Sequence, residues 1–122
     1  MTVPAAGGVL PIDKPEGPTS HDVVAHARRA LKTRKIGHTG TLDPFATGLL
    51  LVCVGPATRL SPFLNVLDKR YEAEALLVVE TDTLDKYGEV TARHAGAYEL
   101  SDADGREAIW GLKGSLSQVP PI

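Results

Sequence analysis

The chain has 122 residues, of which 43% are hydrophobic, enough for one globular domain with its own core. Its single cysteine, Cys53, excludes an internal disulfide framework, favours a reducing compartment and, within an apolar run, is predicted to be a small buried hydrophobe. No apolar run is long enough to cross a bilayer, and residues 1–8 lack the parts of a signal peptide, so we expect a cytoplasmic protein outside the membrane.

The charge is unevenly distributed, although its sum is only −2. Residues 1–67 carry seven Lys and Arg against four acids, whereas residues 68–122 carry six against eleven. Between Val23 and Leu67 the only acid is Asp43, set among six basic residues. This pattern suits an enzyme that handles a polyanion, because the cations attract phosphates and leave the acid for another task. A solvated basic helix end is the alternative, and charge alone does not choose between them.

The first elements are a strand, a turn and a helix. The apolar run 8–13 predicts a strand, and Pro11 places it at a sheet edge or a bulge. The next residues contain two prolines and a glycine, which predict an ordered turn. Thr19 and Asp22 have the spacing of a capping box, so we expect a helix over residues 20–32.

The later elements continue the alternation of strands and helices. The apolar run 49–54 is short enough for a buried central strand. Helical spacing of apolar residues predicts an amphipathic helix over 57–67, and alternation predicts a strand over 71–80 with a return strand over 89–93. A second capping box predicts a last helix over 101–112. This order predicts a mixed α/β domain whose sheet is incomplete at the C-terminus.

The stretch Gly37–Gly48 is the part of the chain with the clearest chemical pattern. Three glycines in its twelve residues allow tight turns or a close approach to a ligand. Pro44 disfavours helical backbone at Asp43, so we expect this carboxylate on an extended or turn backbone. A plain glycine-rich connector is the alternative, and the more common structure for an isolated Asp-Pro pair.

Several other kinds of site find no support in the spacing of residues. The four histidines do not have metal-ligand spacing, and neither a G-x-S-x-G motif nor a P-loop lysine is present. The polar stretch 81–88 does not match an EF-hand loop and is predicted to be a capped polar turn. Gly37-His38-Thr39-Gly40 matches the short GXXG pattern of KH domains, so a non-catalytic RNA-binding module is the second hypothesis.

Four ordered motifs resemble those of the TruB family, the tRNA pseudouridine synthases that convert the T-loop uridine (U55) to pseudouridine. They are D-K-P-x-G-x-T-S from Asp13, G-H-T-G-T-L-D-P-x-A-x-G-x-L from Gly37, D-K-R-Y-x-A from Asp68 and T-D-T-x-D-x-x-G from Thr81. The final Gln118-Val119-Pro120-Pro121 is similar to a further family segment. With motifs in order across nearly its whole length, the chain is identified as a member of this family.

The resemblance implies that Asp43 is the catalytic residue. It would attack the nucleotide or stabilise the sugar while uracil is detached, rotated and rejoined through carbon. The base must first be flipped out of its loop into a pocket. His38 would help fill the space that the flipped base vacates or contact the flipped region, and Asp82 would contact the substrate or order the pocket. Tyr71 would stack on the uracil or act as a base. No cofactor and no metal are implied.

Further contacts are implied for basic side chains. Lys14 and the loop that runs to Ser20 would support the catalytic loop at the substrate site. Arg59 is a substrate-binding candidate, and phosphate contacts with tRNA are expected among Arg28, Arg29, Lys32, Arg34, Lys35 and Arg59.

The resemblance also implies a pseudouridine-synthase-like fold, α/β with α+β character, in which a mixed, largely antiparallel sheet is flanked by helices. Family members continue with further strands, an arginine that pairs with the catalytic aspartate and often a C-terminal RNA-binding domain. We therefore expect residues 1–122 to be the N-terminal portion of the catalytic domain and to be inactive alone. The full-length protein is expected to be a monomer acting on the tRNA T-stem-loop.

Overall fold

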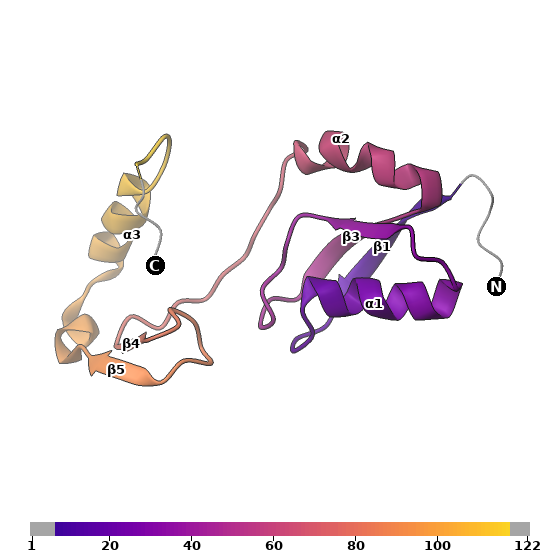
Figure 1. Ribbon diagram of the computed structural model, residues 1–122. Helices are drawn as coiled ribbons and strands as arrows, with labels where there is room; N and C mark the ends of the chain where they lie inside the picture. Colours follow the sequence, from indigo (N-terminus) through magenta and orange to yellow (C-terminus); the bar gives the residue numbers. More distant parts are fainter. Residues whose placement is uncertain (1–6, 118–122) are drawn as a thin grey trace. The chain divides into compact units, whose positions relative to one another are not determined.

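The computed structural model describes residues 7–117, which fall into two compact units divided between Glu72 and Ala73. The first unit contains a three-stranded sheet with helices, and the second contains a two-stranded sheet followed by a helix (Figure 1). Every strand pair in both sheets is antiparallel. The expectation of a mixed α/β fold with largely antiparallel pairing is therefore confirmed.

The first unit is built on strand β3 (Gly48–Val54), which lies between β1 (Gly8–Lys14) and β2 (Ile36–Thr39). The prediction of a buried central strand is confirmed, because Val52 on β3 has no exposed surface. β1 is an edge strand of this three-stranded sheet, as predicted from Pro11. A proline is tolerated there because its missing N–H need not face a second neighbour.

Helix α1 (Ser20–Leu31) confirms the predicted helix. The hydroxyl of Thr19 accepts a hydrogen bond from the backbone N–H of Asp22, whose carboxylate in turn accepts from the N–H of Thr19. This capping box satisfies donors that the first helical turn leaves free. The helix contributes to one hydrophobic core with β2 and β3, whose buried members are Val24, Ile36, Leu50, Val52 and Val54.

Strand β2, at the start of the glycine-rich stretch, was not among the elements predicted from the sequence. Its residues pair with β3, with Ile36 opposite Val54 and Thr39 opposite Leu51. Ile36 is buried and joins the core. A four-residue strand with a glycine at its second position shows no alternating pattern, so only its long-range pairing reveals it.

The second predicted helix is wrong as a single element. A 3₁₀ helix, η1 (Gly55–Leu60), is followed by a short α-helix, α2 (Ser61–Asn65). Pro62 is the physical reason, because it has no N–H to bond to the carbonyl of Thr58 four residues earlier. That carbonyl accepts instead from the N–H of Ser61, which closes a tighter turn.

The predicted strand over residues 71–80 is mostly wrong. Only β4 (Val79–Thr81) is a strand, and it pairs with β5 (Val90–Arg93), which confirms the return strand. Tyr71 and Leu76 are 69% and 70% exposed, so burial on one face does not drive the alternation seen in this segment. Without a neighbouring strand in the described part of the chain, the alternating pattern has no ladder to join.

Helix α3 (Asp102–Gly111) confirms the last predicted helix and its capping box, which Ser101 and Asp104 form. A short 3₁₀ helix, η2 (Ala95–Glu99), precedes it and was not expected. None of the α3 residues is buried, and Trp110 is 71% exposed. The helix therefore owes its ends to local capping more than to packing.

Two predictions from composition concern burial and the membrane. Cys53 is a free, fully buried thiol on β3, as expected of a small hydrophobe. Among residues 7–117, no helix has the length and apolar character required to cross a bilayer. The proposed family segment at residues 118–121 lies outside the described residues.

The capping box of α1 predicts a loss of stability in acid. The hydrogen bonds from the Thr19 hydroxyl and backbone lower the pKa of Asp22 below its ordinary value of 3.8. Because the folded state holds the ionised form, this contribution is present above pH 3.8 and is lost as the pH falls through the depressed pKa. Thermal unfolding followed by circular dichroism should show a smaller acid-induced loss in Asp22→Asn than in the native chain. An identical acid limb in both would contradict the assignment.

Candidate active site

Asp43 lies on the loop 40–47, between β2 and β3. The residues on either side of it are hydrogen-bonded to the segment around the start of α1. The Leu42 N–H donates to the Ser20 hydroxyl at 3.0 Å, and that hydroxyl donates to the Leu42 carbonyl at 3.1 Å. The Pro44 carbonyl accepts from the Gly17 N–H at 2.7 Å. The start of α1 and the turn before it therefore fix the backbone that carries Asp43.

Lys14 forms hydrogen bonds with both the turn before α1 and the Asp43 loop. Its side chain is fully buried at the end of β1, and its ammonium donates to the carbonyls of Pro15 (2.9 Å), Pro18 (2.8 Å) and Pro44 (3.2 Å). An ammonium has three donors, so none is left for an RNA phosphate. This geometry favours the supporting role predicted for Lys14 over direct contact with a substrate.

The Asp43 side chain is displayed, not buried. It is exposed, and its carboxylate makes no hydrogen bond or ion pair with any residue in the range 7–117. Its backbone carbonyl accepts from the N–H of Ala46 at 3.0 Å, which closes a turn after the aspartate. The prediction of a carboxylate on turn backbone is therefore confirmed, and both of its oxygens are free to react with or bind a ligand.

His38 belongs to the same loop region. Its Nδ1 bonds to the carbonyl of Gly40, at the start of the Asp43 loop. A carbonyl can only accept, so Nδ1 carries the proton and Nε2 of the neutral ring is an acceptor. The ring also stands edge-on to that of His21, with 6.1 Å between centroids. The imidazole is thus fixed near the loop but has no hydrogen bond to the Asp43 carboxylate among the described contacts.

Tyr71 and Arg59 lie in the same unit as Asp43 but make no contact with it in the described structure. Tyr71 is 69% exposed in a segment without regular structure, and Arg59 is exposed on η1. The side chain of Lys69, two residues before Tyr71, does approach the loop, because a Cβ built on Gly40 would lie 3.8 Å from its Cε. The Tyr71 and Arg59 side chains are available to a ligand without being organised around the aspartate.

Asp82 lies in the second unit, where it closes the turn between β4 and β5. Its Oδ1 accepts from the N–H of Glu89 at 2.9 Å, and its own N–H donates to the carbonyl of Glu89. Asp85 accepts from Thr83 and from the Tyr87 N–H, and the Thr83 hydroxyl is the main cause of its lowered pKa. The prediction of a capped polar turn is confirmed.

Five of the six basic candidates for phosphate contacts, all except Arg59 on η1, lie at or just after the end of α1 that is far from the Asp43 loop. Ser20 at the start of the helix contacts Leu42, whereas Arg28 near its end donates to the Ile36 carbonyl at 2.9 Å. Twelve residues span about 18 Å of helix, so the two ends are well separated. At this end of the helix and just after it, Arg29, Lys32, Arg34 and Lys35 are exposed and have no acidic partner among the described residues.

Sequence reasoning missed His21 and the contact that Ser20 makes with the loop, although the family resemblance pointed to the segment up to Ser20 as support for the loop. Ser20 is only 2% exposed and bonds to both backbone groups of Leu42. Its place at the end of the family motif from Asp13 was the available signal, and that motif did not indicate Leu42 as the partner. Among residues 7–117 there is no group of three or more His, Cys, Asp or Glu that could hold a metal ion.

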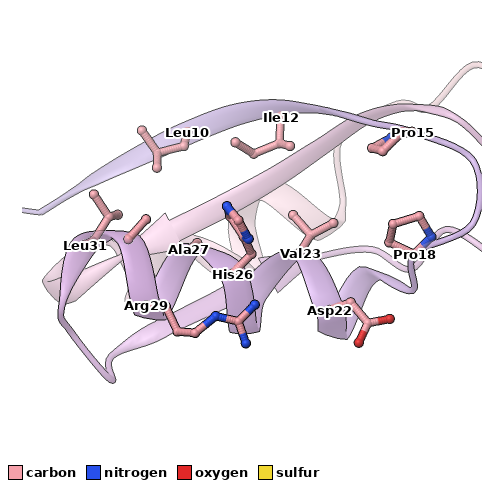
Figure 2. Close-up of a pocket in the computed structure, with 11 residues that line it drawn as sticks. Leu10, Ile12, Pro15, Pro18, Asp22, Val23, His26, Ala27, Arg29 and Leu31 are labelled. Carbon is pink, nitrogen blue, oxygen red and sulfur yellow. The ribbon is translucent and has the colours of Figure 1, made fainter.

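An apolar groove of about 530 Å³ lies between β1 and α1. Leu10 and Ile12 of β1 face Val23, Ala27 and Leu31 of α1 across it (Figure 2). None of the six predicted site residues lines the groove. The candidate active site is therefore the displayed loop and not this groove.

Comparison with known proteins identifies the family. The model of the TruB family pseudouridylate synthase N-terminal domain matches residues 28–122. The chain belongs to this family. The matched range includes Asp43 and the anchored loop that carries it.

Two relatives are tRNA pseudouridine synthase B proteins. The protein of Symbiobacterium thermophilum is 52% identical over 115 residues, and that of Geobacter sulfurreducens is 48% identical over 116 residues. Each alignment covers 94% of this chain and 38% of the relative, so the chain spans well under half the length of either pseudouridine synthase. A solved H/ACA RNP bound to a substrate RNA containing 2'-deoxyuridine aligns with 49% of this chain and 19% of its own, at 48% identity and a TM-score of 0.46.

Proposed function

We propose that this family member acts, in the full-length protein, as a tRNA pseudouridine synthase on the T-loop uridine, with Asp43 as its nucleophile. The observation that carries the proposal is the free, exposed carboxylate of Asp43, on a loop fixed at Leu42 and Pro44. A nucleophile must be held in one geometry while its reacting atoms stay accessible, and this loop meets both requirements.

The proposed reaction needs no cofactor, because it is an isomerisation. The bond between N1 of the uracil and C1′ of the ribose breaks, the ring rotates, and C5 joins C1′. The hydrogen on C5 leaves as a proton, and N1 gains one, so atoms and charge balance. The base has to leave its stack to reach the loop, at a cost of a few kcal/mol.

The proposed partner is the T-stem-loop of tRNA, bound by a monomer. The free cations at the end of α1 suit phosphate groups, because neutralising phosphates releases condensed counterions. The first unit carries these cations, whereas the acids that make the net charge negative are concentrated after residue 68. Action on tRNA would place the protein in the cytoplasm, which agrees with the free thiol of Cys53.

A transcribed tRNA T-arm with tritium on uridine C5 tests the proposal, because pseudouridine formation releases that tritium to water. The full-length protein should release one equivalent for each T-arm and none from an arm in which the target uridine is cytidine. The alternative, a non-catalytic RNA-binding module, predicts RNA binding without release from either arm. Release from other uridines at the same rate would reject the T-loop specificity.

Two replacements of Tyr71 separate its proposed roles. Tyr71→Leu removes the ring, and a lost base–aromatic stack should weaken binding of the flipped base by about 1–3 kcal/mol. Tyr71→Phe keeps the ring, so it should retain RNA affinity while losing turnover if the hydroxyl acts as a base. The side chain is 69% exposed, so neither variant should change the unfolding free energy. Equal losses of turnover in Phe and Leu would argue against a purely stacking role.

A further inference from the structure

We infer that Ser20 is a positioning residue for catalysis, which sets the orientation of Asp43 through the backbone of Leu42. The inference rests on the proposed function of Asp43. The Ser20 side chain is 2% exposed, and its hydroxyl is both acceptor and donor to Leu42, at 3.0 Å and 3.1 Å. A hydroxyl has one proton to donate, and this one is committed to the loop.

The two hydrogen bonds fix two successive peptide planes. The Leu42 N–H belongs to the peptide that enters Leu42, and the Leu42 carbonyl belongs to the peptide that ends at the Cα of Asp43. Because a peptide unit is planar, holding that carbonyl also directs the N and Cα atoms of Asp43. Ser20 therefore holds the residue directly before the one that it orients.

Ser20 is itself held in place by the packing of α1 in the hydrophobic core. Ser20 is the first residue of α1, and Val24, one turn later, is 2% exposed in the core with Leu50. The position of the loop is thus fixed by bonds to a packed helix and not only by contacts within the loop. A site held by a rigid element is more precise than a free loop.

The neighbouring hydroxyl provides a matched control. Thr19 bonds only to Asp22 among the described side-chain contacts, through the capping box of α1. Two adjacent hydroxyls at one helix start therefore have different tasks. Thr19 stabilises the helix, and Ser20 holds the loop.

The test compares Ser20→Ala with Thr19→Ala in the full-length protein, using tritium release from the T-arm and RNA affinity. Ser20→Ala should lower kcat about 100-fold with RNA Kd unchanged, because a small displacement of a reacting group is enough for such a loss. Thr19→Ala should lower the melting temperature and keep the native kcat below it. Ser20→Thr, which keeps the hydroxyl, should recover most of the turnover.

Amide hydrogen exchange at Leu42 gives a readout that does not depend on activity. The Leu42 amide should be protected from exchange in the native protein and in Thr19→Ala. In Ser20→Ala it should exchange faster than the same amide does in the native protein. Native kcat in Ser20→Ala, or equal losses of kcat in both alanine variants, would overturn the positioning role. A native protein that releases no tritium would reject the proposed function instead, and Leu42 exchange would still decide whether Ser20 holds the loop.

Discussion

Replacing Asp43 by asparagine should abolish pseudouridine formation while leaving the fold unchanged. The amide has nearly the same shape but cannot attack the nucleotide, so kcat should fall by about 10⁴-fold or more, as for other lost nucleophiles. The carboxylate has no partner within residues 7–117, so the unfolding free energy should stay within about 0.5 kcal/mol of native. RNA affinity should be equal or slightly higher, because one negative charge is removed.

The measurements are tritium release in single-turnover conditions, RNA binding and urea unfolding. Glu107→Gln, which removes one charge from an exposed position on α3, is the control and should keep native turnover. Turnover retained in Asp43→Asn would exclude the nucleophile assignment. Unchanged RNA affinity with no release even in the native protein would favour the binding module.

Replacing Lys14 by methionine should destabilise the first unit. Methionine keeps an unbranched side chain but removes the ammonium that bonds to the carbonyls of Pro15, Pro18 and Pro44. The Lys14 side chain has no exposed surface, but its hydrogen bonds to these carbonyls are only partly buried, so water replaces some of the lost donors. Leaving buried acceptors unpaired costs about 1–3 kcal/mol each where no relaxation occurs, so a loss of about 3 kcal/mol is expected.

Urea unfolding measures this loss, and Lys35→Met is the matched control. Lys35 is exposed and its ammonium has no partner in the described range, so that variant should be nearly as stable as native. RNA affinity separates the two roles considered for Lys14. If Lys14 only supports the loop, folded Lys14→Met binds RNA as the native protein does and loses turnover. A stable variant with weak RNA binding would instead indicate direct contact.

The features predicted from sequence were those with local causes. Both capping boxes, at Thr19 and Ser101, depend on residues three apart and formed as expected. The edge position of Pro11 follows from a missing N–H, and the central strand β3 from a continuous apolar run. The Asp43 turn followed from the proline after it.

The features that were missed depend on distant partners. β2 exists because it pairs with β3, and the failed strand at Tyr71 has the right alternation but no neighbour. The second helix failed for a local reason that hydrophobic spacing does not report, the missing N–H of Pro62. The family resemblance indicated that Lys14 and the segment up to Ser20 support the loop, but no pattern of residue types indicated their partners, the carbonyls of Pro44 and Leu42.

The anchors of the Asp43 loop also determine when it can form during folding. The bonds from Ser20 to Leu42 and from Lys14 to Pro44 join residues 22 and 30 positions apart. Contacts of this separation require loop closure and form after local ones such as the α1 cap. A chain still leaving the ribosome with β1 and α1 but without β3 would therefore not yet display the aspartate. The reactive carboxylate is presented only once the first unit is assembled, so partly folded molecules lack the site.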